Sequence, residues 1–238
     1  GVFLRTNRGV IQLMNKCYKI VEAENNMKQA FGLTSYIGGK PSLPASFALP
    51  RCRLCGSEQT FFLQVAFPAD HPWHGKSLAV FACTACADKN YRIPPMLETQ
   101  LKAVDIPDGF LNDYQVNFHF VVFDTATATL RTDAQEKIKF KGLHLKPVED
   151  LGVPGNKLGG IPNWVLDDES PATYRSAIPM IFLLQLEQDF RFEKTLDSPP
   201  QMRIGLSGKP EPALLPDYKL FLGNALFLFG TNGSNQYW

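Results

Sequence analysis

Apolar residues along this chain fall into short runs separated by polar, turn-forming stretches. Residues 60–67 are mostly apolar on both faces and predict a buried strand, and residues 76–82 predict a return strand after the loop 68–75. Residues 116–123 predict a further strand. The chain also holds 18 Gly and 18 Pro, which favour turns, so the pattern predicts an α+β fold that is rich in β structure and has few long helices.

The first 35 residues show a different pattern. Within residues 12–31, apolar side chains recur at roughly helical spacing and predict one amphipathic helix, whose stripe is Cys17, Ile20, Val21, Met27 and Phe31. Residues 1–35 are therefore interpreted as an N-terminal helical or irregular segment. Residues 36–44 predict a turn, because two adjacent glycines followed by proline provide positive φ and then a fixed φ.

This turn and the strand after it occur a second time, 121 residues further along the chain. The repeat predicts a duplicated β-unit with pseudo-twofold packing, the first copy in residues 36–150 and the second in residues 151–238. The return strand 78–82 also resembles residues 226–230. The residues that match at the spacing of 121 are Gly38, Gly39, Pro41, Phe61, Leu63 and Gln64, with Gly159, Gly160, Pro162, Phe182, Leu184 and Gln185.

Both copies keep a glutamine inside an apolar strand, Gln64 and Gln185. A buried amide needs hydrogen-bond partners, and the backbone of the nearby turn is a natural source of them. We expect both glutamines to be structural.

The strongest chemical signal is a pair of Cys-x-x-Cys motifs that bracket the predicted hairpin, formed by Cys52, Cys55, Cys83 and Cys86. Four thiolates fill every position of a tetrahedral zinc ion, so these residues predict a closed, structural Zn²⁺ site in the first unit. A redox-active pair, two disulfides and unrelated buried cysteines are the alternatives.

The second unit lacks these ligands, since Thr173, Ser176 and Thr231 align with three of the cysteines. Zinc would then stabilise only the first unit, and Cys52→Ser would unfold that unit while residues 157–238 stay folded.

Several other residues have side chains that can bind metals or catalyse reactions, but their sequence context favours structural roles. Cys17 is expected to be an ordinary thiol, since four cysteines complete the site. His71 and His74 lie at the tip of the loop, away from the strand ends that carry the cysteines. His119 has apolar neighbours and is expected to be a core histidine. Trp73, at the same tip, is either an anchor for a partner or packed on its own loop.

Composition narrows the class of partner. The net charge is +1, with 24 Lys and Arg against 23 Asp and Glu, and no basic stripe indicates a nucleic acid partner. The apolar runs are too short to span a bilayer, and residues 1–13 do not show a secretory signal pattern. Four of the five cysteines are in metal-like pairs, which favours a cytoplasmic protein.

The motif order resembles two related families. Gly38-Gly39-x-Pro41, Cys52-x-x-Cys55, residues 62–65 and a return strand ending in Cys83 are similar to the N-terminal part of the programmed cell death protein 2 family. Residues 157–164, 182–186 and 224–229 resemble the YwqG-like family of uncharacterised bacterial proteins. The resemblance implies a β-rich α+β fold with a duplicated unit. For the eukaryotic relatives it also implies a non-enzymatic role as a dedicated chaperone of a newly made small-subunit ribosomal protein, and for the bacterial relatives a link to toxin immunity.

Three classes of function follow from these residues. The first is a non-enzymatic, zinc-stabilised protein that binds another protein, a ribosomal protein or another small client, in a chaperone-like or adaptor-like way. A toxin-immunity protein is an alternative within the same class. The second is a hydrolase of unknown substrate, assembled from the acidic loop 167–169 and the histidines of loop 68–75. The third is a nucleic-acid-binding zinc ribbon with Arg51 and Arg53, which the neutral charge disfavours.

Overall fold

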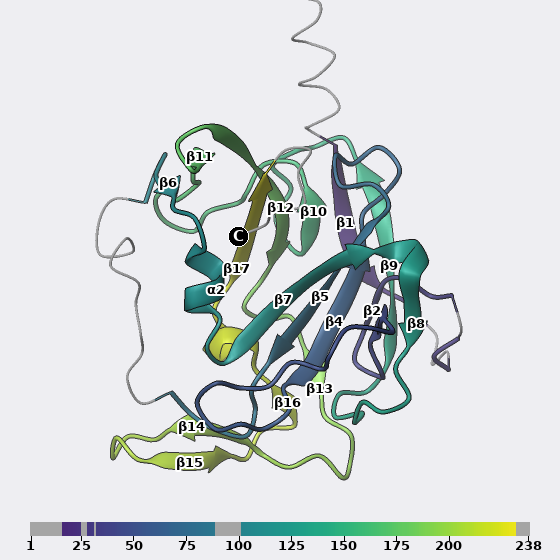
Figure 1. Cartoon of the computed structure of the whole chain (residues 1–238), viewed down its shortest axis with the longest axis vertical. Helices are drawn as coiled ribbons and strands as arrows, with labels where there is room; N and C mark the ends of the chain where they lie inside the picture. The colour runs from purple at the N-terminus through teal and green to yellow at the C-terminus, as the bar shows by residue number, and fades with distance from the viewer. Residues whose placement is uncertain (1–15, 25–27, 31, 89–100, 232–238) are drawn as a thin grey trace, which may run out of the picture.

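The computed structural model describes residues 16–24, 28–30, 32–88 and 101–231 of the 238 (Figure 1). Strands dominate these residues, and helices are few and short, as the sequence predicts. The helices are α2 (Phe110–Tyr114) and two 3-10 turns, η2 (Thr125–Thr127) and η3 (Leu220–Gly223). The strands are β1 (Cys17–Glu22), β2 (Tyr36–Ile37), β3 (Ser42–Pro44), β4 (Thr60–Ala66), β5 (Lys76–Ala82), β6 (Asp105–Ile106), β7 (Phe118–Asp124), β8 (Ala128–Leu130), β9 (Lys141–Val148), β10 (Lys157–Gly159), β11 (Thr173–Tyr174), β12 (Ile178–Leu186), β13 (Phe192–Glu193), β14 (Gln201–Ile204), β15 (Pro210–Ala213), β16 (Asp217–Tyr218) and β17 (Leu226–Thr231).

Eleven of these strands form one sheet in the order β6-β11-β12-β10-β1-β9-β2-β4-β5-β7, with β17 paired to β12. The pairs in this sheet are antiparallel, apart from the parallel pair β6–β11. Three two-stranded sheets accompany it, β13–β16, β14–β15 and β3–β8. The β14–β15 hairpin projects at the lower end of the molecule in Figure 1.

The helix predicted for residues 12–31 is wrong within the described residues. Cys17–Glu22 is instead the strand β1, which lies between β9 and β10 and pairs with both. Both neighbours come from residues 141–159, so pairing across the fold, and not the local apolar spacing, determines the conformation of this segment. Residues 12–15, 25–27 and 31 of the predicted helix lie outside the described residues.

Two parts of the sheet have the same register. Tyr36 lies opposite Gln64 in β2–β4, and Lys157 lies opposite Gln185 in β10–β12. The pairs β4–β5 and β12–β17 also correspond, and in each a bulge interrupts the register, between Phe61 and Leu63 in the first and between Phe182 and Leu184 in the second.

The predicted glycine turns are present after β2 and at the end of β10. Gly38 and Gly39 have φ of 57° and 65°, and Gly159 and Gly160 have φ of 68° and 76°. These values lie in the left-handed region that favours glycine. Space is also limiting, because a Cβ on Gly38 would lie 2.5 Å from the carbonyl oxygen of Ile138.

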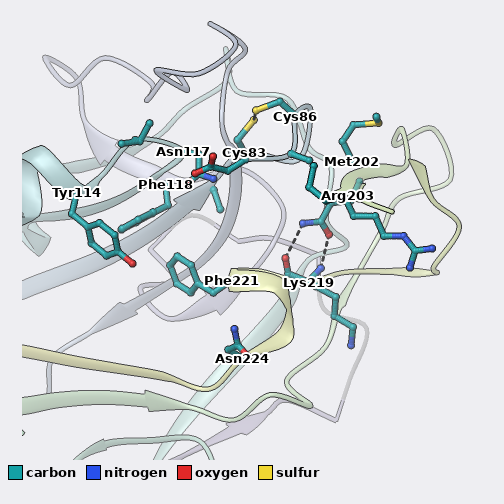
Figure 2. A pocket seen from close by; sticks show the side chains of 16 residues that line it. Cys83, Cys86, Tyr114, Asn117, Phe118, Met202, Arg203, Lys219, Phe221 and Asn224 are labelled. Atoms are coloured by element: carbon teal, nitrogen blue, oxygen red, sulfur yellow. Dashed lines mark hydrogen bonds between the residues drawn. The ribbon is translucent and has the colours of Figure 1, made fainter. Parts of the chain in front are cut away.

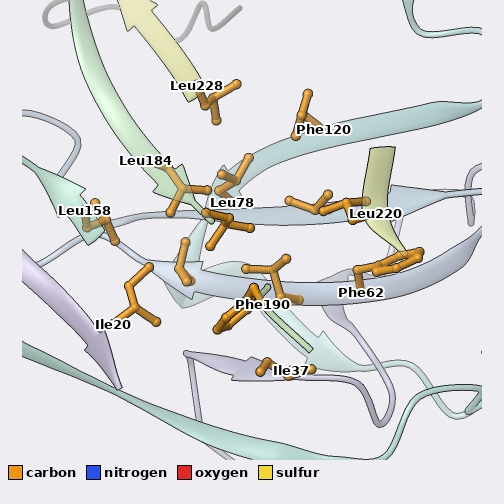
Figure 3. Packing of buried hydrophobic residues seen from close by; sticks show 14 of the residues in the cluster. Ile20, Ile37, Phe62, Leu78, Phe120, Leu158, Leu184, Phe190, Leu220 and Leu228 are labelled. Carbon is orange, nitrogen blue, oxygen red and sulfur yellow. The ribbon is translucent and has the colours of Figure 1, made fainter. Parts of the chain in front are cut away.

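Residues from both halves of the sheet share one hydrophobic core (Figure 3). Phe62 of β4 and Leu78 of β5 belong to the same buried cluster as Leu184 of β12 and Leu228 of β17. A second, smaller cluster covers the opposite face of β4, β5 and β7. The two segments that the sequence divides at residue 150 are therefore packed on each other through a common interior.

Trp73 belongs to this shared interior and is only 3% exposed. Its indole Nε1 donates a hydrogen bond to the carbonyl oxygen of Thr231 at 2.9 Å, and its ring packs edge-on against Phe67. The interpretation of Trp73 as an exposed anchor for a partner is therefore wrong. Its ring joins the loop 68–75 to β17.

The strand predicted for residues 116–123 is β7, which begins at Phe118. Among the described residues, no helix has the length and apolar character needed to cross a membrane.

Candidate metal centre

The structure brings the four predicted ligands together. The sulfurs of Cys52, Cys55, Cys83 and Cys86 all lie within 4.8 Å of one another. Three of the separations are 3.7 Å (Cys52–Cys86), 3.7 Å (Cys55–Cys83) and 3.6 Å (Cys83–Cys86). Tetrahedral zinc with Zn–S bonds of about 2.3 Å would place its sulfurs about 3.8 Å apart, so the cluster has the size that one tetrahedral ion requires. The separations are much longer than a disulfide bond of about 2.05 Å.

The first pair of cysteines is held in a tight loop between Arg51 and Glu58, which form an isolated bridge. The Cys52 N–H donates to the Ser57 carbonyl at 2.9 Å, and the Gly56 N–H donates back to the Cys52 carbonyl at 2.8 Å. Gly56 has a φ of 75°, so glycine suits the position that turns the chain directly after Cys55.

The second pair directly follows the end of β5. The Cys83 N–H donates to the Asn117 carbonyl at 2.7 Å, and the Arg53 N–H donates to the neighbouring Val116 carbonyl at 2.8 Å. Both cysteine loops are therefore anchored to the residues before β7. Thr84 adds a hydroxyl contact of 2.7 Å with Thr60.

Burial and neighbouring groups shift the pKa of three of these cysteines, Cys55, Cys83 and Cys86. Burial raises the pKa of Cys83 to about 11, and burial together with the neighbouring thiol of Cys55 raises the pKa of Cys86 well above its ordinary value. Burial also opposes ionisation of Cys55, but hydrogen bonds with Ser57 and the nearby thiols lower its pKa to about 7. Four thiolates this close repel one another, so a bound divalent cation is what would favour the fully deprotonated set.

The other candidate ligands lie elsewhere. Cys17 is buried beside Gly160, and burial raises the pKa of its thiol. His71 is buried and stacks on Phe67, and its Nδ1 accepts the Trp73 N–H at 3.0 Å. Within the described ranges, the four cysteines are the only group of three or more His, Cys, Asp or Glu placed to share a metal ion.

The residues considered for a hydrolase are not assembled into one site. Asp167, Asp168 and Glu169 are exposed, and Asp168 accepts the Ser170 N–H at 2.9 Å. Asp168 also lies 3.5 Å from the ammonium group of Lys102. His71 is buried, and within the described residues neither it nor His74 forms a group of three or more His, Cys, Asp or Glu with these carboxylates.

An open groove of about 370 Å³ lies directly beside the second cysteine pair (Figure 2). Aromatic side chains from three elements form much of its wall, namely Tyr114 of α2, Phe118 of β7 and Phe221 of η3. Strand β14 forms another wall with Met202 and Arg203. Sequence reasoning did not identify this groove, because no local pattern indicates that residues 201–224 pack against Cys83.

Side-chain hydrogen bonds fix the far wall of the groove. The Gln201 amide donates to the Lys219 carbonyl at 2.9 Å and accepts the Lys219 N–H at 2.7 Å, as the dashed lines in Figure 2 show. The Met202 N–H donates to the Thr84 carbonyl at 3.0 Å. Strand β14 is therefore hydrogen-bonded to Lys219, directly before η3, and to Thr84 of the second cysteine loop.

No model of a known protein family matches this chain, and a search of curated proteins also finds no match.

Proposed function

We propose that this protein binds another protein without catalysing a reaction, and that a structural zinc ion stabilises its binding surface. The sulfur-only donor set and the separations of about 3.7 Å suit zinc. Four protein ligands leave no position open for a substrate or water, which supports a structural role for the ion. Reduced cysteines in this arrangement also fit a reducing compartment such as the cytoplasm.

The observation that carries the binding proposal is the β14–β15 hairpin. Gln201–Ile204 line the groove beside the cysteines, and the same hairpin exposes Leu206 completely at its tip. Leu214 and Leu215, which follow β15, are also exposed, as is Leu196 before β14. Exposed leucines on this hairpin and in the segments next to it, beside an aromatic groove, are typical of a surface that contacts another protein.

The partner that we propose is a small client protein, and a ribosomal protein is the candidate that the resemblance to the programmed cell death protein 2 family supports. In this proposal the chain acts as a chaperone or adaptor for that client. The groove offers aromatic side chains and cationic side chains such as Arg203 and Lys219.

We also propose that the chain holds two copies of one β-unit. The common registers and the equivalent bulges of β4–β5 and β12–β17 support this interpretation. Strand β1 precedes residues 36–150, and β9, at the end of those residues, directly precedes residues 151–238. Strand β1 pairs with β10 of the second unit, and β9 pairs with β2 of the first. The copies are therefore proposed to exchange their first strands around a pseudo-twofold axis.

A pull-down from native lysate tests the binding proposal. Tagged wild-type chain is compared with Leu206→Asp/Leu214→Asp, and retained proteins are identified by mass spectrometry and confirmed by tagging the partner in turn. Phe47→Asp is the control, since this apolar side chain is also exposed but lies between β3 and β4, away from the hairpin. We expect one defined partner to be lost only from the first variant. Equal recovery with all three proteins, or no defined partner at all, would reject the proposal.

A further inference from the structure

One edge of the large sheet has no strand beside it in the described part of the chain. Strand β5 lies between β4 and β7, whereas β17, which corresponds to β5 in register, pairs only with β12 among the described strands. Phe229 lies opposite Phe182 in the way that Phe81 lies opposite Phe61. No described strand therefore lies beside β17 in the way that β7 lies beside β5.

The N–H and C=O groups of alternate β17 residues point away from β12 and could pair with an added strand. The Glu187 N–H points to the β10 side of β12, where it bonds to Asn156 Oδ1 at 2.8 Å. Successive residues of a strand direct their N–H and C=O groups to opposite sides. The residue before Glu187 therefore faces β17 and pairs with Leu226. It follows that Phe227 and Phe229 direct their backbone groups away from β12, at the outer edge.

In the first half of the sheet, β7 completes a buried apolar cluster on the outer face. Leu43, Phe61 and Phe81 belong to that cluster, and β7 contributes Val121 and Phe123. All five side chains are buried.

The second half of the sheet has a corresponding apolar cluster, but no described strand covers it as β7 covers the first. Trp164 stands 121 residues after Leu43, and it stacks on Phe227 with ring centroids 4.0 Å apart. Phe182 contacts Phe229 at 5.6 Å. Trp164, Phe182 and Phe227 are only half-buried, in contrast to their buried counterparts in the first half. A strand with apolar side chains at alternate positions would cover them as β7 covers the first cluster.

We propose that the outer edge of β17 binds an extended segment of the partner protein by strand addition. The segment runs antiparallel to β17, pairs with the backbone of Phe227 and Phe229, and places apolar side chains two residues apart against Trp164. This inference rests on the proposed protein-binding function and specifies the chemistry of the partner: an apolar, β-prone segment of at least about four residues, with the character of β7.

A peptide with the sequence of residues 116–124, which include β7, is a suitable probe. The pairing of β7 with β5 shows which of its N–H groups would face β17. The Phe120 N–H bonds to Gln115 Oε1 at 2.6 Å, away from β5, so the Val121 N–H faces β5 and the Val122 N–H faces away. Binding of the capped peptide to the full chain is measured by fluorescence anisotropy. N-methylation at Val121 should weaken binding by about tenfold or more, because it removes an edge hydrogen bond and adds a methyl group against β17. N-methylation at Val122 is the matched control and should change the affinity less than about threefold.

A variant of the protein tests the same edge from the other side. Phe227→Pro removes an N–H that does not bond to β12, and Phe227→Ala removes the ring but keeps that N–H. We expect Phe227→Pro to abolish peptide binding and Phe227→Ala to weaken it, with the circular dichroism spectrum unchanged. If Phe227→Pro does not fold, the difference in affinity between the two N-methylated peptides alone tests strand addition. Equal effects of the two methylations, or no binding of the unmodified peptide, would overturn the inference.

The outcome separates this inference from the function that it rests on. A defined partner that is retained equally by the wild-type chain and by folded Phe227→Pro would keep the proposed function and reject strand addition. A wild-type chain that forms dimers which Phe227→Pro loses, measured by analytical ultracentrifugation without partner, would assign the edge to a second copy and also reject the proposed occupant.

Discussion

Gln64 and Gln185 make the same hydrogen bond in two different strands. Each side-chain Oε1 accepts the backbone N–H of the residue 22 positions earlier, Ser42 at 3.2 Å and Asn163 at 2.8 Å. Both glutamines are almost completely buried, and the turn backbone is the partner that the sequence suggests for each. The two amides therefore hold a glycine turn against the strand that follows it.

Replacing either glutamine should destabilise the fold. Gln64→Ala and Gln185→Ala leave a backbone N–H without its acceptor and a small cavity in the sheet, which costs about 2–4 kcal/mol in the free energy of unfolding. Urea denaturation of the metal-loaded protein measures this. Gln188→Ala, at an exposed position, is the control and should change the free energy by less than about 0.5 kcal/mol. Equal effects at all three positions would contradict the structural role.

Loss of the proposed zinc ion should unfold both halves of the sheet together. Cys52→Ser removes one ligand, and we expect it to lower the free energy of unfolding by about 3 kcal/mol or more, since structural zinc contributes on the order of 10 kcal/mol. The sequence alone suggests that residues 157–238 would remain folded, but Phe62 and Leu184 share one core, so the transition should be cooperative.

Hydrogen exchange of amides in β4 and β12, with zinc content measured in parallel, checks this prediction. Cys17→Ser is the control, because this buried thiol lies outside the cluster and its loss should leave the zinc content unchanged. Protection that persists in β12 after β4 has lost it would show two independent units.

Acid should weaken the fold through His71. Burial lowers the pKa of this imidazole from 6.5 to about 4, although the nearby Asp70 acts in the opposite direction. The folded state therefore resists protonation, and its stabilisation is complete above pH 6.5 and is lost progressively as the pH falls towards 4. The loss is at most about 3 kcal/mol.

His71→Asn isolates this contribution. The asparagine carbonyl can still accept the Trp73 N–H, but it does not titrate, so the variant should show a smaller fall in the free energy of unfolding between pH 6.5 and 4.5. Acid also removes zinc, but both proteins carry the same four cysteines, so the difference between their slopes reports His71. Identical slopes would show that His71 does not contribute.

The contact between Trp73 and β17 leaves no room for a side chain at Gly230. A Cβ there would lie 2.5 Å from the indole ring and 2.7 Å from Leu183. Gly230→Ala should therefore destabilise the protein by about 1–3 kcal/mol, through overpacking. Thermal denaturation with tryptophan fluorescence measures the effect. Gly152→Ala is the control, since its nearest new contact would be an ordinary 3.7 Å, and an equal loss at both positions would contradict the packing argument.

Local patterns predict much of this molecule, and the exceptions have a common physical cause. The Cys-x-x-Cys pairs and the paired glycines carry their geometry within a few residues, so the cysteine cluster and the turns follow from the sequence. Strand β1 cannot be predicted in this way, since both of its partner strands begin more than 100 residues later in the chain. The groove beside Cys83 likewise depends on Met202 and Phe221, which no local signal connects to the cysteines.

The pairing of β1 with β9 has a consequence for the order in which the protein folds during synthesis. Glu22 is made 121 residues before Leu143, its partner in β9, and β10 emerges later still. At synthesis rates of about 5–20 residues per second, β1 waits roughly 6–24 s without its partners while the nascent chain grows. The first Cys-x-x-Cys hairpin, residues 52–86, is complete well within that interval. The β2–β4 and β4–β5 pairs and the cysteine cluster can therefore form first, and the N-terminal strand joins the sheet only after β9 and β10 have been made.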